Sequence, residues 1–140
     1  MTDSSDTIDS MASDPRLGLV VTHRRYVPYS HAHYAGNLVD GAYSLAAFGD
    51  VATEMCVVTD GDEGLFASYS DVQFLAPVRA GDCIEIEATL VRVGTRSREM
   101  EFAVRVVARG NPERGESAAD ALEPPVIATT ARGVVVVPAR

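Results

Sequence analysis

Hydrophobic and polar positions alternate most clearly in the second half of the chain. Residues 84–90 alternate Ile, Ile, Ala and Leu with Glu and Thr, and residues 100–106 alternate Met, Phe and Val with Glu, Ala and Arg. A period of two is that of a β-strand with one buried face. Because residues 94–97 between them contain Gly and Ser, the two segments predict neighbouring strands joined by a hairpin connection.

Three further segments are rich in the β-branched and aromatic residues that are typical of strands. Residues 17–26 form the first, which Pro28 ends. Residues 65–74 form the second, which ends before Pro77, and residues 126–137, rich in Val and Thr, form the third. Together with the alternating pair, these segments predict five strands.

Between the first two of these strands, apolar residues recur every three or four positions. From Leu38 to about Val57 this spacing predicts a helix. Small residues dominate the predicted buried stripe, so we expect the helix to approach a sheet closely. The stripe consists of Leu38, Ala42, Leu45, Gly49, Ala52 and Cys56, and the other side of Asp40, Tyr43, Ala47, Asp50 and Glu54.

The resulting order, β-α-β-β-β-β, predicts an α+β fold in which an antiparallel sheet wraps one central helix. A chain of 140 residues is long enough for one such domain. We expect it over residues 15–140, after a disordered tail at residues 1–14, with a mobile loop at residues 110–125, because both segments are poor in apolar residues. A lone sheet leaves unpaired edges, so pairing with a second copy is expected.

Charge and composition exclude several functions. The net charge is −8, which disfavours binding to nucleic acid or to an anionic membrane surface. All twelve basic residues are Arg, so Schiff-base chemistry, which needs a lysine amine, is excluded. Two unpaired cysteines, Cys56 and Cys83, fit a reducing cytoplasm. The first residues lack the pattern of a signal peptide, and no segment has the length of a membrane span.

Two acids on the predicted helix are candidates for proton transfer. Asp50 lies between Phe48-Gly49 and Val51-Ala52, so we expect it to be partly desolvated and suited to act as an acid or base. A solvated carboxylate is the alternative. Glu54 follows one turn later, either as a second acid/base group or as a surface acid paired with arginine.

The start of the predicted helix offers a second group of candidates. Gly36 and Asn37 come just before it, where exposed N–H groups would suit a developing negative charge on oxygen. Asn37 is also a candidate N-cap. His31 and His33 could ligate a metal, but no third ligand has convincing spacing, so no metal site is predicted.

Several motifs resemble one protein family. Residues 31–42 and 48–52, together with residues 71–82 and 93–97, resemble the helix signature and the strands of hotdog-fold acyl-CoA thioesterases. More narrowly, His33-Tyr-Ala-Gly-Asn-Leu-Val-Asp-Gly-Ala42, Phe48-Gly-Asp-Val-Ala-Thr-Glu54 and Asp60-Gly-Asp-Glu-Gly-Leu-Phe66 resemble the β-aminoacyl-CoA ammonia-lyases, the hotdog enzymes of β-alanyl-CoA and 3-aminobutyryl-CoA metabolism. The resemblance covers roughly residues 16–109.

The resemblance implies roles for further residues, each with a plain structural alternative. His33 or Tyr34 would orient the thioester carbonyl or a water, and Tyr43 would hydrogen-bond at the thioester. The acidic turn of Asp60, Asp62 and Glu63 would attract a substrate ammonium. Contacts to the phosphates or pantetheine of CoA are expected from Arg96, Ser97 and Arg79.

The sequence therefore predicts a β-aminoacyl-CoA ammonia-lyase, a carbon–nitrogen lyase that works without a metal or organic cofactor, with CoA as part of the substrate. Asp50 or Glu54 would remove the α-proton, and N–H groups near Gly36 to Leu38 would hold the enolate oxygen. One alternative is a thioesterase for acyl-CoA or acyl-carrier-protein thioesters, and another is a non-catalytic acyl-thioester binding module. We expect a homodimer or a multiple of dimers.

Overall fold

The computed structural model describes residues 14–139, which form one long helix and five strands. This is the predicted order of elements. Two short 3-10 turns, η1 and η2, come between the first strand and the helix. The elements are β1 (Val20–Tyr26), η1 (Tyr29–His31), η2 (Ala35–Asn37), α2 (Gly41–Asp60), β2 (Leu65–Phe74), β3 (Cys83–Val93), β4 (Ser97–Gly110) and β5 (Ala119–Val136).

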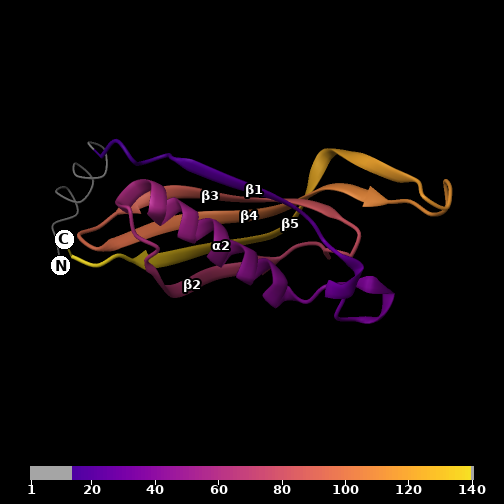
Figure 1. The fold of residues 1–140 in the computed structure, drawn as a ribbon, viewed down its shortest axis with the longest axis horizontal. Helices are drawn as coiled ribbons and strands as arrows, with labels where there is room; N and C mark the ends of the chain where they lie inside the picture. The colour runs from indigo at the N-terminus through magenta and orange to yellow at the C-terminus, as the bar shows by residue number, and fades with distance from the viewer. Residues whose placement is uncertain (1–13, 140) are drawn as a thin grey trace.

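All neighbouring strands in the sheet are antiparallel, in the order β1-β3-β4-β5-β2. The helix α2 lies across one face of this sheet (Figure 1). The strand that precedes the helix and the strand that follows it, β1 and β2, are therefore the two edges. This connectivity places each end of the helix next to a loop that joins it to an edge strand.

The alternating pattern of β3 and β4 is confirmed. Ile84, Ile86, Ala88 and Leu90 are buried towards the helix, whereas Glu85 and its outward neighbours are partly exposed. Ion pairs connect the charged residues of the outer face, among them the pair of Arg105 with Glu87 and the pairs of Arg132 with Glu99 and Glu101. One sheet face thus forms the core, and the other is polar.

The face of α2 that packs on the sheet differs from the predicted one. Large side chains fill it, and Phe48 stacks on Phe102 of β4 with ring centroids 5.0 Å apart. Ala42, on the predicted buried stripe, is exposed, whereas Ala47, on the predicted polar side, is buried. Burial of a Phe or Met removes more apolar area from water than burial of an Ala or Gly, so these residues set the rotation of the helix. Its buried residues are Ser44, Ala47, Phe48, Val51, Ala52, Met55 and Cys56.

The helix also begins later than predicted. Its first residue is Gly41, and its N-cap is Asp40, whose side chain accepts a hydrogen bond from the Tyr43 backbone N–H at 3.2 Å. The prediction of Asn37 as N-cap is wrong, because Asn37 lies in η2 with a left-handed φ of 64°. At the other end, Gly61 takes the left-handed conformation at the predicted turn.

The predicted loop at residues 110–125 is shorter in the structure: only residues 111–118 lie outside strands, and residues 119–125 belong to β5. Here β4 and β5 continue as a two-stranded hairpin, with Arg109 paired to Asp120 in register. Asn111 and Arg114 hydrogen-bond to the Asp120 side chain and fix the turn between the strands. In Figure 1 this hairpin projects beyond the end of the sheet that carries the start of α2. Backbone hydrogen bonds therefore form here without a large apolar core, and the mobility of the hairpin stays a prediction.

The predicted disordered tail, residues 1–14, lies almost wholly outside the described residues. Only Asp14 is described, and its carboxylate is hydrogen-bonded to the Arg16 side chain. Within residues 14–139, no helix is long and apolar enough to cross a bilayer.

Candidate active site

Asp50 lies halfway along α2, on the side that faces away from the sheet. Its side chain is 65% exposed, so the expected partial desolvation is wrong for the single chain. The carboxylate accepts a hydrogen bond from Arg25 Nη2 of β1 at 3.1 Å. The apolar neighbours in the sequence do not bury Asp50, because Phe48 and Val51 point into the core from the opposite side of the helix.

Glu54, one turn later, pairs with a second residue of β1. The His23 Nε2 lies 2.8 Å from Glu54 Oε1. The structural alternative for Glu54 predicts an arginine partner, and the structure has a histidine instead. The sequence reasoning missed both His23 and Arg25, although their spacing gave a usable signal: Val21, His23 and Arg25 alternate along the face of β1 that turns towards the helix.

A cleft of about 220 Å³ opens beside Asp50. Glu63, Gly64 and Phe66 border it from the chain that enters β2, and Thr53 borders it from the helix. Nearby on β2, the Tyr69 hydroxyl donates to the Leu45 carbonyl at 2.6 Å. Burial, reinforced by the negative charge of Asp50, raises the pKa of Tyr69 to about 12, so the hydroxyl stays protonated at neutral pH.

The loop before the helix forms a tight reversal of the chain. The backbone N–H groups of His33 and Tyr34 both donate to the Leu38 carbonyl, at 2.8 and 2.9 Å. Between Tyr34 and Leu38, Gly36 has a φ of 77°, a conformation that favours glycine. Tyr34 also borders a hollow of about 460 Å³ that extends to Ser44 and Phe74.

The loop side chains make their own contacts. His31 Nδ1 is hydrogen-bonded to the Tyr43 hydroxyl at 2.9 Å, and His33 Nδ1 lies 3.8 Å from a carboxylate oxygen of Asp40. Nowhere in residues 14–139 do three or more His, Cys, Asp or Glu side chains gather closely enough to hold a metal ion.

The loop and Asp50 are not neighbours within one chain. From position 41 to position 50, a rise of about 1.5 Å per residue gives an axial distance of about 13 Å. The structure thus brings Asp50 and Glu63 to the same cleft, and places the predicted enolate-binding residues Gly36 and Asn37 at the far end of the helix.

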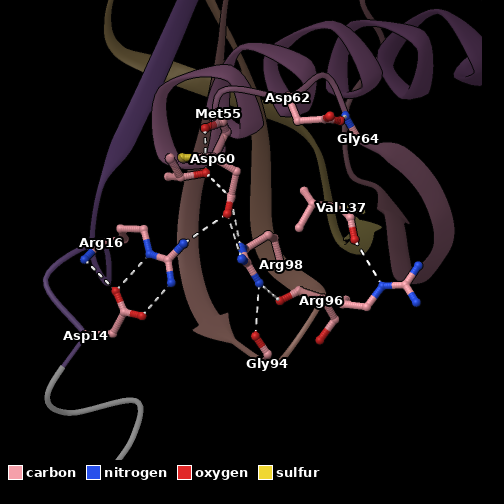
Figure 2. Close-up of polar contacts among 12 residues, drawn as sticks. Asp14, Arg16, Met55, Asp60, Asp62, Gly64, Gly94, Arg96, Arg98 and Val137 are labelled. Carbon is pink, nitrogen blue, oxygen red and sulfur yellow. Dashed lines mark hydrogen bonds and ion pairs between the residues drawn. The ribbon is translucent and has the colours of Figure 1, made fainter. Parts of the chain in front are cut away.

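Asp60 belongs to an ionic cluster at the last turn of α2 (Figure 2). Arg98 Nε and Nη2 donate to its two carboxylate oxygens at 2.8 and 2.7 Å, and Arg16 Nη1 donates at 3.0 Å. These contacts, with Arg98 the strongest, hold the pKa of Asp60 well below its usual value. Both oxygens are engaged by arginines within the protein, which disfavours the expected role of Asp60 in attracting a substrate ammonium.

The other members of the acidic turn differ from Asp60. Asp62 accepts a hydrogen bond from the Gly64 N–H at 2.8 Å, which closes the turn into β2. Only Glu63 borders the cleft beside Asp50. Of the three acids in the turn, it is therefore the one placed to meet a ligand there.

The predicted CoA contacts lie in two places. Arg96, in the turn between β3 and β4, donates from Nε to the Val137 carbonyl at 3.3 Å and borders a hollow of about 320 Å³ at the helix's last turn. The Ser97 carbonyl accepts from the buried Arg98. Arg79 is exposed next to Leu38, near the loop before the helix. Their role in phosphate binding stays a prediction.

Comparisons with known proteins agree with this architecture. Residues 36–113 match the family model described as "Thioesterase superfamily". A curated protein of Acetoanaerobium sticklandii named 3-aminobutyryl-CoA ammonia lyase is 50% identical over 107 residues, which are 76% of this chain and 85% of the relative.

Solved structures extend the likeness to three dimensions. The β-alanyl-CoA:ammonia lyase of Clostridium propionicum superposes with a TM-score of 0.81 at 39% identity, over 86% of each chain. A hexameric hotdog-fold thioesterase of Campylobacter jejuni, 19% identical, shares the fold with a TM-score of 0.69, over 84% of this chain and 82% of its own. The chain belongs to the hotdog-fold thioesterase superfamily and, within it, to the family of ammonia lyases that act on CoA thioesters.

Proposed function

We propose that this protein eliminates ammonia from a β-aminoacyl-CoA, or adds it in reverse. The observation that carries the proposal is the 50% identity to a 3-aminobutyryl-CoA ammonia lyase, in a segment that includes the helix with Asp50 and Glu54. A thioester acidifies the α-proton. A carboxylate of α2 takes that proton, the Cα–Cβ double bond forms, and the Cβ–N bond breaks. The β-ammonium leaves as neutral ammonia, which balances the charge.

The cleft beside Asp50 supports this chemistry. An ammonium group is attracted by nearby carboxylates, and Asp50 and Glu63 both border the cleft. Phe66 provides an apolar wall for the acyl chain. In this proposal Asp50 removes the α-proton, and Glu63 attracts the ammonium group. Glu54 is a partner of the base.

The enolate oxygen needs hydrogen-bond donors close to the reacting carbon. The donors expected around Gly36 to Leu38 lie about 13 Å from Asp50 along the helix axis in the same chain. We therefore propose that the loop of a second copy reaches the cleft, so that two subunits complete each site. A dimer with two such sites, alone or as part of a larger multiple, is the assembly that this requires.

The edge strand β2 is the surface proposed for that pairing. It is ten residues long, contains no proline, and has backbone groups that face no further strand of residues 14–139. Leu65, Phe74 and Leu75 expose apolar side chains along it and just beyond it. A copy paired there would lie next to Phe66 and the cleft. Light scattering at micromolar concentration should give at least a dimeric mass, and a monomeric mass would exclude this arrangement.

Two further parts of the proposal concern the environment of the reaction. The thioester and the carboxylate supply the chemistry, so we propose that no metal or organic cofactor takes part beyond the CoA of the substrate. Arg96 and Arg79 are the proposed contacts for CoA phosphates, since arginine binds phosphate in a forked geometry. A cytoplasmic location is proposed from the two unpaired cysteines.

One assay tests the function directly. Ammonia and free thiol are measured together on 3-aminobutyryl-CoA, β-alanyl-CoA and the corresponding plain acyl-CoAs. The lyase releases ammonia from the β-amino substrates without releasing thiol. Thiol release from acyl-CoA or an acyl-carrier protein would instead support a thioesterase, and tight binding without turnover would support a binding module.

Mixing inactive variants tests the shared site. Asp50→Asn and Gly36→Val each remove one half of the proposed site. If each site combines Asp50 of one subunit with the loop of another, half of the sites in a mixed dimer are intact. Random exchange of equal amounts should then restore about a quarter of wild-type activity. No recovery after verified subunit exchange would place both halves of the site in one chain.

A further inference from the structure

Arg25 is the centre of a chain of contacts that joins the loop before the helix to Asp50. Its guanidinium donates to Asp50 at 3.1 Å, and its central carbon lies 5.6 Å from the centre of the Tyr43 ring. The Tyr43 hydroxyl in turn is hydrogen-bonded to His31 at 2.9 Å. Arg25 of β1 thus contacts two residues of α2, Asp50 and Tyr43, and His31 of the preceding loop contacts the second of them.

Folding stability does not explain this arrangement. The Asp50 side chain is 65% exposed, and ion pairs between exposed groups contribute little to stability. The Arg25 side chain is less exposed, at 31%, and its planar group rests against an aromatic ring. A planar arginine held over an aromatic ring restricts the orientation of the carboxylate that it binds more than a flexible lysine does.

We propose that Arg25 is a positioning residue for the reaction. It holds the Asp50 carboxylate in the orientation in which it takes the α-proton, and Tyr43 and His31 hold Arg25. The inference rests on the proposed function, because it gives Asp50 the role of the base. It assigns no substrate contact to Arg25, which acts only through Asp50.

The neighbouring residue in β1 provides a matched control. Arg24 points to the opposite face of the sheet, where its Nη2 donates to Glu85 at 2.9 Å. Both arginines lie in β1, and each donates a hydrogen bond to a carboxylate. The acid bound by Arg25 is a candidate base, and the acid bound by Arg24 is not. Arg24→Met therefore reports what the loss of an arginine in β1 does by itself.

The experiment compares Arg25→Met, Arg25→Lys and Arg24→Met in wild type and in Asp50→Asn. Ammonia and thiol release give kcat and KM on 3-aminobutyryl-CoA. For variants too slow for that assay, the rate of exchange of the substrate α-proton in D₂O is measured. Arg25→Met should lower kcat by about 10²-fold, the usual effect of a misplaced reacting group, with KM changed less than about twofold. Arg25→Lys should retain an intermediate kcat, and Arg24→Met should match wild type.

The double variants decide whether Arg25 acts through Asp50. In the Asp50→Asn background, Arg25→Met should cause no further loss. A kcat of Arg25→Met equal to that of Arg24→Met, or an equal loss with and without Asp50, would overturn the inference. If Arg25→Met does not fold, Arg25→Lys decides by the same comparison. If wild type releases no ammonia, the proposed function fails first and the inference with it.

Discussion

The carboxylates of Asp50 and Asp60 lie on the same helix, yet their surroundings differ in almost every respect. Asp60 is 13% exposed and receives hydrogen bonds from two arginines (Figure 2). Asp50 is 65% exposed, borders a cleft and, among residues 14–139, receives a hydrogen bond from one arginine. Both are acids paired with arginine, so the pairing itself does not distinguish a structural acid from a reactive one.

The two acids differ because their arginine partners are buried to different degrees. Arg98 occupies an inward position of β4, in the buried row with Met100 and Phe102, and its side chain is only 6% exposed. A guanidinium at such a position requires a counter-charge, and Asp60 supplies it at both oxygens. Arg25 remains partly exposed to water, so the fold does not require a counter-charge beside it. Under the proposed function Asp50 is the acid left available to a substrate, whereas Asp60 serves the fold.

Asp50→Asn should have the largest effect on turnover. It keeps the size of the side chain and can still contact Arg25, but it removes the base. We expect normal folding and a loss of about 10²–10⁴-fold or more in kcat, the usual contribution of a positioned acid or base. Ammonia release and α-proton exchange measure it. Full activity of this variant would give the role of base to Glu54 or Glu63.

Asp60→Asn should lower stability and leave kcat unchanged, the opposite of Asp50→Asn. Removing the charge leaves Arg98 buried without a counter-charge, so the free energy of unfolding should fall by about 3 kcal/mol or more. Urea unfolding measures this, with Asp120→Asn as a control for an exposed acid paired with arginine. The folded fraction of Asp60→Asn should keep its kcat. A large loss of kcat at unchanged stability would remove the distinction between the two acids.

The pH dependence of stability sharpens the same contrast. Hydrogen bonds from Arg98 lower the pKa of Asp60 in the folded protein, whereas an aspartate in the unfolded chain titrates near its ordinary value of about 3.9. Asp60 therefore adds stability that is complete above the unfolded pKa and is lost as pH falls through the lower folded pKa. Urea unfolding from neutral to acid pH should show a steeper loss in wild type than in Asp60→Asn. Parallel curves would contradict this.

Glu54→Gln should cost less than Asp50→Asn. Its carboxylate pairs with His23 and lies one turn beyond Asp50. We expect a fall in kcat of about tenfold or less, as for a partner rather than a base. The same coupled assay measures it. If Glu54→Gln is the more damaging of the two, the roles assigned to the two acids are reversed.

Removal of metal should have no effect. Dialysis against a chelator, followed by the ammonia assay, should leave kcat unchanged if carboxylates alone carry out the proton transfer. Loss of activity that added divalent metal restores would show that a metal takes part.

Much of the fold followed from local pattern. A period of two predicted β3 and β4, and proline placed the ends of the first two strands. Besides the start of α2, two local predictions failed for physical reasons. The rotation of α2 was set by Phe48 stacking on Phe102, a contact between residues far apart in the sequence. The paired strands on either side of residues 111–118 are held by backbone pairing and by contacts to Asp120, which apolar content does not reveal.

The sequence by itself determined the order of elements, the family and the helix that carries the candidate acids, because these depend on periodicity and on motifs read along the chain. Only the tertiary structure decided which acids remain available. Asp50, Glu54 and Asp60 look alike as residues on one helix. Their partners Arg25, His23 and Arg98 come from β1 and β4, which are distant in sequence, and exposure to solvent is a property of the packed sheet and helix together.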